Sequence, residues 1–271
     1  MYFICPKCNE KLLIEDGRAV CINSHSYDRS RAGYYNLLLS SARGVHGDNK
    51  QMVMARRAFL SEGFYQPLES KLSELVLTHT APLGTVLDAG AGEGYYTDAI
   101  ERAIYMRDGE SRVSAFDISK DAVREIARKN SRIELAVAGS YHMPIADGTF
   151  DTVVNTFSPL ALSETLRVLK RGGIFIMAIV GVEHLFELKS VIYTVPYKNT
   201  VMDTALEGFE LLSDDRVKYT MRLTKSEDVR SLFMMTPYAY RTREEDRRRI
   251  DAISSLDCTA DFRIFVYRRQ D

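Results

Sequence analysis

Short apolar runs alternate with amphipathic stretches over most of the chain, beginning near residue 83. The apolar runs, which are rich in Val, Ile, Leu, Phe and Ala, begin at Thr85 and continue at 113–117, 133–138, 150–155 and 174–180. Each is short enough for a buried strand, and helical stretches, such as the one carrying Leu162, Leu166 and Leu169, lie between them. This alternation predicts an α/β fold, a doubly wound and mostly parallel sheet with helices on both faces.

The first 80 residues show a different pattern. The segments 12–14 and 18–20 flank Asp16-Gly17, a pair typical of tight hairpin turns. Further along, four aliphatic residues between 68 and 76 recur at helical spacing and predict an amphipathic helix. We therefore expect three parts in the chain: a small β module (residues 1–38), a linker and helix (39–64) and a large α/β domain (65–271).

Composition bounds the class of protein. At 271 residues, with 45% hydrophobic and 27% charged residues, the chain is long enough for one α/β domain and a small appendage. No apolar run approaches the roughly 20 residues that a membrane span needs, and the start of the chain lacks the pattern of a secretory signal. We expect a cytoplasmic protein with no membrane partner.

Charge is unevenly distributed, although the net charge of the chain is −1. Residues 1–60 hold nine Lys and Arg against five Asp and Glu, so the remaining residues carry a net charge of −5. A basic amino-terminal region on an acidic body suits contact with phosphates. An ordinary solvated surface has a similar composition, so charge alone does not establish a nucleic-acid partner.

Three of the four cysteines lie in the first 21 residues and are followed by a histidine. Cys5, Cys8, Cys21 and His25 have the spacing C-x2-C-x12-C-x3-H, in which two thiolates share one turn and a second pair closes the site. The pattern predicts a zinc site that is structural, because protein side chains fill all four positions. Disulfides are the alternative, but there is no secretory signal and the fourth cysteine, Cys258, is remote.

A glycine loop follows the first strand of the predicted sheet. The strand runs through Gly90, Gly92 and Gly94 into a helix, so the backbone can approach a ligand at the carboxyl end of the strand. The next strand ends in Asp117, an acid placed to accept hydrogen bonds from both ribose hydroxyls of a nucleoside cofactor. The alternative for Asp117 is a cap on the helix that opens at Ser119.

These features together resemble a class I S-adenosylmethionine (SAM)-dependent methyltransferase over residues 83–181. The signs are the D-x-G-x-G-x-G loop, the acid that ends the second strand, and the L-K-R-G-G turn before the strand at 174–180. The resemblance implies roles for several residues: Gly90, Gly92, Glu93 and Gly94 approach the methionyl part of SAM, and Asp117 holds its ribose. The loop 139–147 lies where it would cover the adenine ring.

The resemblance extends over nearly the full chain. The motifs G-Y-Y-N-L-L, M-A-R-R-A-F-L, Y-Q-P-L, H-L-F-E-L-K and M-T-P-Y-A follow the cysteine motif in an order that is similar to the RlmA family of bacterial 23S rRNA guanine-N1 methyltransferases. By this resemblance Tyr65 and His184 join the cofactor site. Taken alone, Tyr65 fits a packing residue at the start of a helix, and His184 fits a helix cap.

The resemblance also implies the reaction, which is methylation of N1 of a guanine in a domain II hairpin of 23S rRNA, and it allows a homodimer. Guanine N1 carries a proton at neutral pH, so the reaction needs a proton acceptor and an accessible base. Asn155 and Phe157, in the loop after the fourth strand, are candidates for the substrate pocket, and residues 234–241 suit a lid. All of these are also compatible with ordinary loop or core positions, and the sequence marks no residue as the proton acceptor.

The expected RNA contacts are phosphate contacts from the zinc module and from five arginines, Arg29, Arg31, Arg43, Arg56 and Arg57. Two other functions remain open. A small-molecule methyltransferase would use the same core but would leave the zinc site and the basic region without a role. A non-catalytic, zinc-containing RNA-binding assembly factor could retain SAM as a ligand, and the intact glycine loop argues only against lost cofactor binding.

Overall fold

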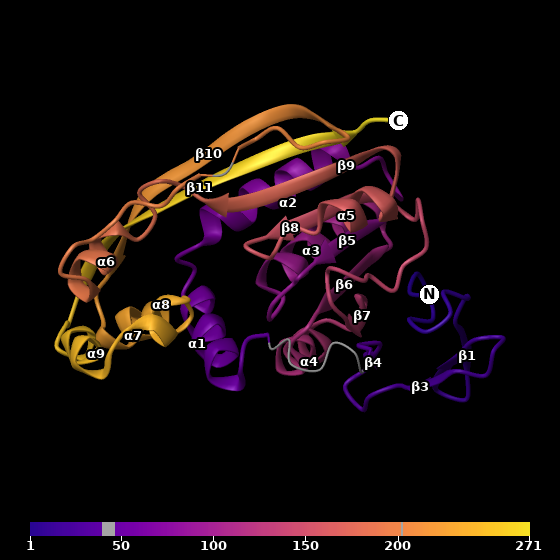
Figure 1. The fold of residues 1–271 in the computed structure, drawn as a ribbon, viewed down its shortest axis with the longest axis horizontal. Coiled ribbons are helices and arrows are strands. Elements are labelled where there is room, and N and C mark those ends of the chain that lie inside the picture. The colour runs from indigo at the N-terminus through magenta and orange to yellow at the C-terminus, as the bar shows by residue number, and fades with distance from the viewer. Residues whose placement is uncertain (40–46, 202) are drawn as a thin grey trace.

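The computed structural model describes residues 1–39, 47–201 and 203–271. One large mixed sheet, with helices on both faces, forms the body, and a small sheet lies near the amino terminus (Figure 1). Among the described helices, none is long and apolar enough to cross a membrane. The predicted α/β architecture is confirmed.

The large sheet has the strand order β10-β11-β9-β8-β5-β6-β7-β4. Its strands are β4 (Tyr35–Asn36), β5 (Val86–Ala89), β6 (Val113–Asp117), β7 (Glu134–Val137), β8 (Phe150–Thr156), β9 (Leu169–Val180), β10 (Phe209–Leu223) and β11 (Leu256–Arg269). From β4 to β9 the neighbouring strands are parallel, whereas β11 is antiparallel to both β9 and β10. The mostly parallel sheet was predicted, and the long β10–β11 hairpin at its edge was not.

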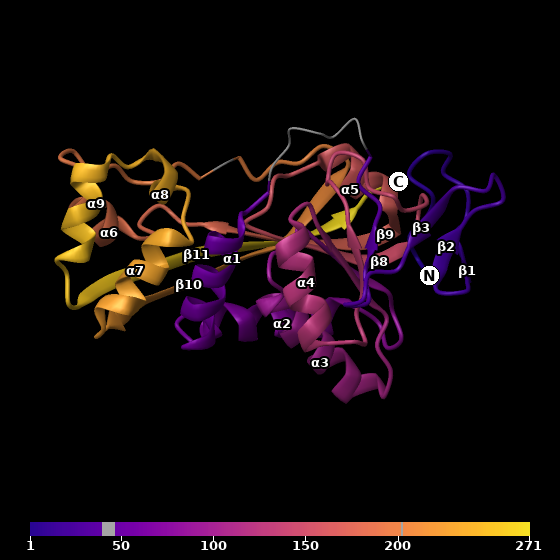
Figure 2. The same ribbon diagram turned by 90° about the horizontal axis from the view of Figure 1, so that it is seen from below.

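Successive residues of a central strand bury their side chains on opposite faces of this sheet. On β8, Val153 and Val154 belong to two separate clusters of buried apolar residues, and so do Phe175 and Ile176 on β9. One face is covered by α2 (Gln66–His79), α3 (Tyr95–Asp108) and α4 (Lys120–Lys129) (Figure 2). The amino-terminal module and α5 (Leu162–Val168) pack on the other face. Burial on both faces explains why these strands are continuously apolar.

The predicted amino-terminal hairpin is confirmed. The small sheet consists of β1 (Leu13–Glu15), β2 (Arg18–Val20) and β3 (Ser26–Asp28). Leu13 pairs with Val20, and Asp16 and Gly17, both at positive φ, form the turn between the two strands.

The amino-terminal module is tied to the body by strand pairing and by shared apolar packing. β4 pairs with β7, so residues just before the expected boundary at 38 form a strand of the large sheet. Phe3 and Leu12 are buried in the same apolar cluster as Phe150 of β8. The module therefore shares its core with the sheet.

A cluster of helices lies at the far end of the β10–β11 hairpin from the amino-terminal module (Figure 1). It contains α6 (Phe186–Ile192), α7 (Ser226–Met234), α8 (Tyr238–Arg241) and α9 (Glu244–Asp251). The helix α1 (Lys50–Ser61) packs against α7 of this cluster and also against α4. Asn49 caps α1 by accepting a hydrogen bond from the Met52 backbone N–H (3.0 Å). Of the expected linker and helix (39–64), residues 40–46 lie outside the described residues.

Two predicted boundaries were wrong. Leu169 was expected on a helix, but α5 ends at Val168 and Leu169 begins β9. The L-K-R-G-G turn lies inside β9, where the pairing with β8 shifts register between Phe150 and Thr152. Gly172, at φ 69°, takes up this irregularity, so that a strand continues where the glycine pair suggested a turn.

Candidate functional site

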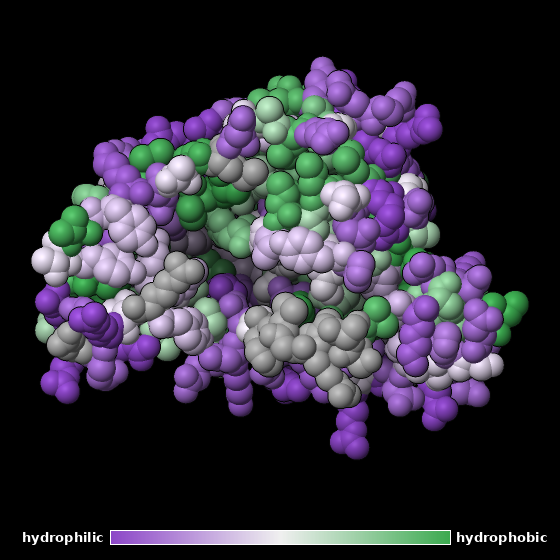
Figure 3. Space-filling view, viewed as in Figure 1, coloured by the Kyte–Doolittle hydropathy of each residue, from purple (hydrophilic) through white to green (hydrophobic). Residues whose placement is uncertain are grey.

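A cavity of about 1170 Å³ lies beyond the carboxyl ends of β5, β6 and β8. Its walls come from the loops after these strands, from α1, and from the segment between α7 and α8. Figure 3 shows the hollow between the helical end of the molecule and the sheet, with apolar residues in its wall. Ligands of open α/β sheets bind at this edge, so the cavity is the candidate site.

Two of the three motif glycines line the cavity. A Cβ atom at Gly90 would lie 2.0 Å from Ser158 Oγ, so only glycine fits between β5 and the loop after β8. Gly92 lines the cavity as well, at φ 57°. Gly94 does not line it, because its Cα faces α4, where a Cβ would lie 2.6 Å from Ile126 Cγ1. The structure thus places Gly94 in helix packing and brings only the first two motif glycines to the cavity.

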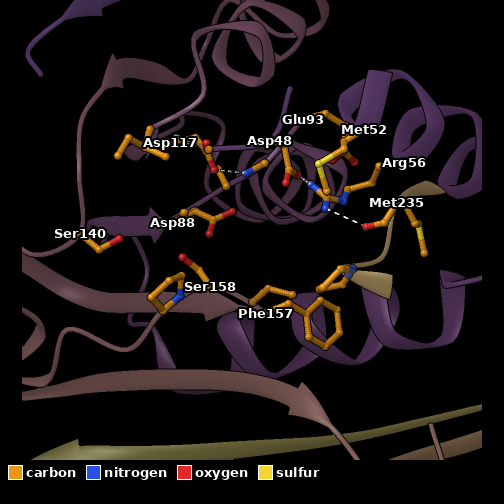
Figure 4. A pocket seen from close by; sticks show the side chains of 18 of the residues that line it. Asp48, Met52, Arg56, Asp88, Glu93, Asp117, Ser140, Phe157, Ser158 and Met235 are labelled. Carbon is orange, nitrogen blue, oxygen red and sulfur yellow. Dashed lines mark hydrogen bonds and ion pairs between the residues drawn. The ribbon is translucent and has the colours of Figure 1, made fainter. Parts of the chain in front are cut away.

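Asp88 is buried in the floor of the cavity. Thr97 donates a hydrogen bond to Asp88 Oδ2 (2.5 Å), whereas Asp88 Oδ1 has no hydrogen-bond partner. Burial raises the pKa of Asp88 to about 7. Figure 4 shows the carboxylate on one wall of the cavity, between Asp117 and Ser158. A carboxylate at this place in the cavity wall could hold the ammonium group of the methionyl part of SAM.

The raised pKa of Asp88 makes the stability of the ligand-free protein depend on pH. The pKa rises from 3.8 to about 7 on folding, so between these values the folded chain binds more protons than the unfolded chain. The free energy of unfolding should therefore fall as pH rises from about 4 to 7, on the order of a few kcal/mol from this group. Urea unfolding at several pH values should show that the free energy of unfolding falls less with pH in Asp88→Asn than in the unchanged chain. An equal fall in both would contradict the assignment of this pH dependence to Asp88.

Asp117 holds the glycine loop and the start of α4 together. Its carboxylate accepts hydrogen bonds from the backbone N–H groups of Gly92 (2.9 Å) and Ser119 (2.7 Å), and it lines the cavity. Ser119 itself caps α4 by accepting from the Ala122 backbone N–H. Burial raises the pKa of the Asp117 carboxyl, against the effect of the two N–H donors. The position is compatible with ribose binding, and the helix cap is provided by Ser119.

Tyr65 and His184, which are 119 residues apart in the sequence, meet in the cavity wall. Tyr65 Oη lies 3.3 Å from His184 Nε2, and the Asp261 backbone N–H donates to His184 Nδ1 (3.3 Å). Burial lowers the pKa of His184 to about 3, so the ring is neutral. Since Nδ1 accepts a hydrogen bond, the proton of the neutral ring is on Nε2 and points to Tyr65 Oη. The hydroxyl hydrogen of Tyr65 is then available to an acceptor in the cavity.

The Tyr65 ring also has the packing role that its sequence position suggested. It contacts Phe59 and Phe262 edge-on, with ring centroids 5.3 and 4.9 Å apart. The residue precedes α2 directly and is buried in the main apolar cluster. Tyr65 therefore combines the two interpretations, since its ring packs in the core and its hydroxyl reaches the site.

Arg56 was interpreted as a phosphate contact, and the structure places it inside the cavity instead. Its guanidinium pairs with Asp48 through Nη1 and donates from Nη2 to the Met235 carbonyl oxygen (3.2 Å). Its side chain is 26% exposed. No sequence pattern indicated this position of Arg56, because α1 is brought over the cavity by its packing against α7.

Three of the other predicted arginines lie outside the cavity. Arg57 pairs with Glu125 of α4 (2.5 Å), Arg29 donates to the Gly33 carbonyl oxygen (3.3 Å), and Arg31 is exposed. Arg43 lies outside the described residues. These exposed positions keep a phosphate contact possible for the amino-terminal region, as an expectation from the sequence.

The two substrate-pocket candidates take different positions. Asn155 is buried and donates to the Pro159 carbonyl oxygen (3.4 Å), so it shapes the loop after β8 and does not line the cavity. Phe157 lines the cavity, is 42% exposed and has a φ of 56°. A non-glycine residue in this conformation is strained, and such strain is concentrated at functional sites. Residues 235–238 also line the cavity, as expected for the segment interpreted as a lid.

The four predicted zinc ligands converge at the amino terminus. Their ligand atoms lie within 4.8 Å of one another. His25 Nδ1 is 3.4 Å from the sulfurs of Cys5 and Cys8 and 3.5 Å from that of Cys21, and the Cys8 and Cys21 sulfurs are 3.7 Å apart. In a zinc tetrahedron with bonds of about 2.0 to 2.3 Å, neighbouring donors lie about 3.3 to 3.8 Å apart. The donor set and its spacing therefore fit a structural zinc ion, and Cys258 is far from it on β11.

The fold, the glycine loop and the cavity define a class I SAM-dependent methyltransferase with an amino-terminal zinc module. The family model described as a methyltransferase domain matches residues 86–173, and the one described as RlmA, N-terminal, matches residues 3–41. The YcgJ protein of Bacillus subtilis has the same fold, with a TM-score of 0.50 and 14% identity over 74% of this chain and 98% of that one.

Two relatives identify the family more narrowly. The chain is 30% identical to the 23S rRNA (guanine(748)-N(1))-methyltransferase of Streptomyces fradiae, over 82% of this chain and 80% of the relative. It is 32% identical to a Micromonospora griseorubida protein named for 23S rRNA (guanine-N(1)-)-methyltransferase activity, over 97% and 96% of the two chains. The chain belongs to the family of 23S rRNA guanine-N1 methyltransferases.

Proposed function

We propose that this chain transfers the methyl group of SAM to N1 of a guanine in 23S rRNA. The observation that carries the proposal is a cofactor cavity edged by exposed aromatic rings, in a chain of this family. Tyr141, Phe157 and Tyr240 line the cavity and are 67%, 42% and 54% exposed. Exposed rings at a cavity mouth suit stacking of an unpaired base, which is how single-stranded RNA is recognised.

Phe157 is the best-placed ring for such stacking. It is supported from behind by Phe262 and Tyr96, with ring centroids 5.6 and 6.3 Å away. It directly follows β8, the strand beside β5, and so lies next to the part of the cavity where Gly90 and Ser158 meet. A rigid ring here can hold a flipped guanine against the site from which the methyl group is transferred.

The reaction requires that the N1 proton leaves guanine and that N1 is held in line with the methyl group. SAM, when bound, supplies that methyl group on a sulfonium sulfur. His184 does not serve as the proton acceptor in this arrangement, because its Nδ1 accepts from the Asp261 N–H and its Nε2 carries the proton. The Tyr65–His184 pair instead presents a hydrogen-bond donor to the cavity. Its role is to hold acceptor groups of cofactor or base.

The direct test is incubation of the purified chain with methyl-labelled SAM and an unmodified 23S rRNA domain II hairpin transcript, followed by digestion to nucleosides. Label in 1-methylguanosine is the expected result. Label in metabolites but not in RNA would favour a small-molecule methyltransferase. SAM binding without any methyl transfer to RNA, including assembled ribosomal particles, would favour the non-catalytic assembly factor.

The finer features of the substrate are part of this proposal. The target is a guanine in a domain II hairpin loop, the zinc module contributes RNA contacts, and the enzyme acts in the cytoplasm, where its substrate is. A homodimer is the proposed assembly. Stops in reverse transcription would locate the modified guanine, and sedimentation equilibrium would give the number of chains.

Replacing Phe157 with alanine is expected to lower kcat/KM for RNA by about 10- to 100-fold, since base–aromatic stacking is worth about 1 to 3 kcal/mol. SAM binding should change little. Tyr105→Ala is the matched control, because Tyr105 is similarly exposed (41%) and does not line the cavity. Unchanged RNA kinetics in Phe157→Ala would remove Phe157 from the substrate site.

A further inference from the structure

Among the residues that the structure describes, those that line the cavity are rich in acids and poor in cations. Four of them carry carboxylates: Asp48, Asp88, Glu93 and Asp117. Among the lining residues that the structure describes, Arg56 is the only lysine or arginine. SAM carries an anionic carboxylate as well as an ammonium and a sulfonium group. The acids suit the two cationic groups of SAM. The carboxylate of SAM needs a cation, and among the described lining residues Arg56 is the lysine or arginine that could supply it.

Arg56 lies beside the part of the loop that the methionyl group of SAM should approach. Its Nη1 atom is 3.7 Å from the position that a Cβ atom would take on Gly92. The guanidinium thus lies beside the glycine loop, at ordinary contact distance from a Cβ position on Gly92. Figure 4 shows Arg56 on the side of Asp48 and Met235, across the cavity from Asp88.

The guanidinium already binds one carboxylate and retains capacity for another. It is an ion-pair partner of Asp48 through Nη1, and Nη2 donates to the Met235 carbonyl oxygen. Arginine has five N–H donors in a planar fork, and a carboxylate can take two of them side by side. The Asp48 pair shows that a carboxylate fits against Arg56 in this cavity. Asp48 and a ligand carboxylate can share the fork or exchange on it.

We propose that Arg56 binds the carboxylate of the methionyl part of SAM. It is then a cofactor-binding residue supplied by α1, in addition to the loops of the sheet. The ammonium group, which is on the same carbon atom as the carboxylate, then faces the acidic side of the cavity, which includes Asp88. The two charged groups of the methionyl part are thereby recognised by two side chains of opposite charge.

Arg56 has a competing structural role, because it joins Asp48 to Met235 and so links two segments that are 187 residues apart in sequence. If Arg56 had only a structural role, its replacement would weaken the binding of every cofactor analogue to the same degree. If Arg56 binds the carboxylate, its replacement would weaken the binding only of ligands that carry this group. The comparison of two ligands therefore separates the two roles.

The experiment measures dissociation constants by calorimetry for SAM and for decarboxylated SAM, which lacks only the carboxylate. The unchanged chain should bind SAM about 10- to 100-fold more tightly than the decarboxylated ligand, which is the usual gain in affinity from a charge-assisted hydrogen-bonded pair. In Arg56→Met this preference should disappear, mainly by weaker SAM binding, and Arg56→Lys should restore part of it. Arg57→Met, at the neighbouring exposed arginine, should keep the full preference.

An unchanged preference in Arg56→Met, or an equal loss for both ligands in Arg56→Met and Arg56→Lys, would overturn the proposal. If Arg56→Met does not fold, Arg56→Lys still decides, because a single ammonium group in place of the planar fork should narrow the preference for SAM without removing it. The readout is binding without RNA, so failure here and failure of the proposed reaction on rRNA are distinguishable.

Discussion

Replacing Cys21 with serine is expected to abolish zinc binding and to reduce rRNA methylation at least about 100-fold, because structural zinc contributes on the order of 10 kcal/mol to the folding of small zinc modules. Cys21 and His25 form the second half of the site, and β2 and β3 lie on either side of them. Without the zinc ion, the turns of the small sheet are no longer held together. RNA contacts made by this module should be lost with it.

SAM binding should survive the Cys21→Ser change within a few fold. The module reaches the cavity only through its last two residues, Leu37 and Leu38. These are held by the body, because β4 pairs with β7 and the Leu37 N–H donates to the Val137 carbonyl oxygen (2.9 Å). Zinc content, SAM calorimetry and RNA methylation, measured on one preparation, check the prediction. Cys258→Ala is the control, because this buried cysteine on β11 is remote from the zinc ligands. Full RNA activity in the zinc-free protein would show that the module has no role in the reaction.

The features that the sequence predicted well are those whose parts lie close together in the chain. The zinc motif spans 21 residues, and the spacing of its ligands alone defines the site. Residues 85–97 likewise contain a strand, a glycine loop and a helix start, so the approach of Gly90 and Gly92 to the cavity follows from local geometry. Phe157 could be placed near the site because it follows a predicted strand directly.

The features that were missed depend on contacts between distant segments. Arg56 belongs to a sequence that looks like an exposed basic helix, and only the packing of α1 on α7 turns its guanidinium toward Asp48 and Met235. Gly94 fits the cofactor motif by spacing, but the position needs glycine for another reason: a side chain there would collide with Ile126 of α4. A signal for Arg56 existed in the chemistry of the cofactor, since a carboxylate needs a cation and the glycine loop supplies none.

The β10–β11 hairpin was missed for a different reason. Strand β10 carries alternating charged and apolar residues, and most of its side chains are exposed or half-buried. It therefore lacks the continuous apolar run by which the central strands were recognised. The hairpin nevertheless positions the site, because Asp261 of β11 donates its backbone N–H to His184 and accepts, through its carboxylate, the Glu183 N–H (3.0 Å).

Replacing Gly90 with alanine should weaken SAM binding by about 100-fold or more, because the new methyl group has no space and the backbone is in a conformation that favours glycine. Gly90 has a φ of 89°, and its Cβ would lie 2.0 Å from Ser158 Oγ and 2.5 Å from Ser158 Cβ. Either the glycine loop or the loop after β8 must move, and both line the cavity. Calorimetry with SAM measures the effect.

Two further variants separate the clash from the backbone strain. Gly109 ends α3 at φ 76° with no atom within 4 Å of its Cβ position, so Gly109→Ala should cost some stability through strain alone and leave SAM binding unchanged. Ser158→Gly removes the atoms that the new methyl group meets, so the double variant Gly90→Ala/Ser158→Gly should recover part of the lost affinity. Normal SAM binding by Gly90→Ala would contradict the close contact between the two loops. No recovery in the double variant would show that the loop backbone, and not the contact with Ser158, requires glycine at this position.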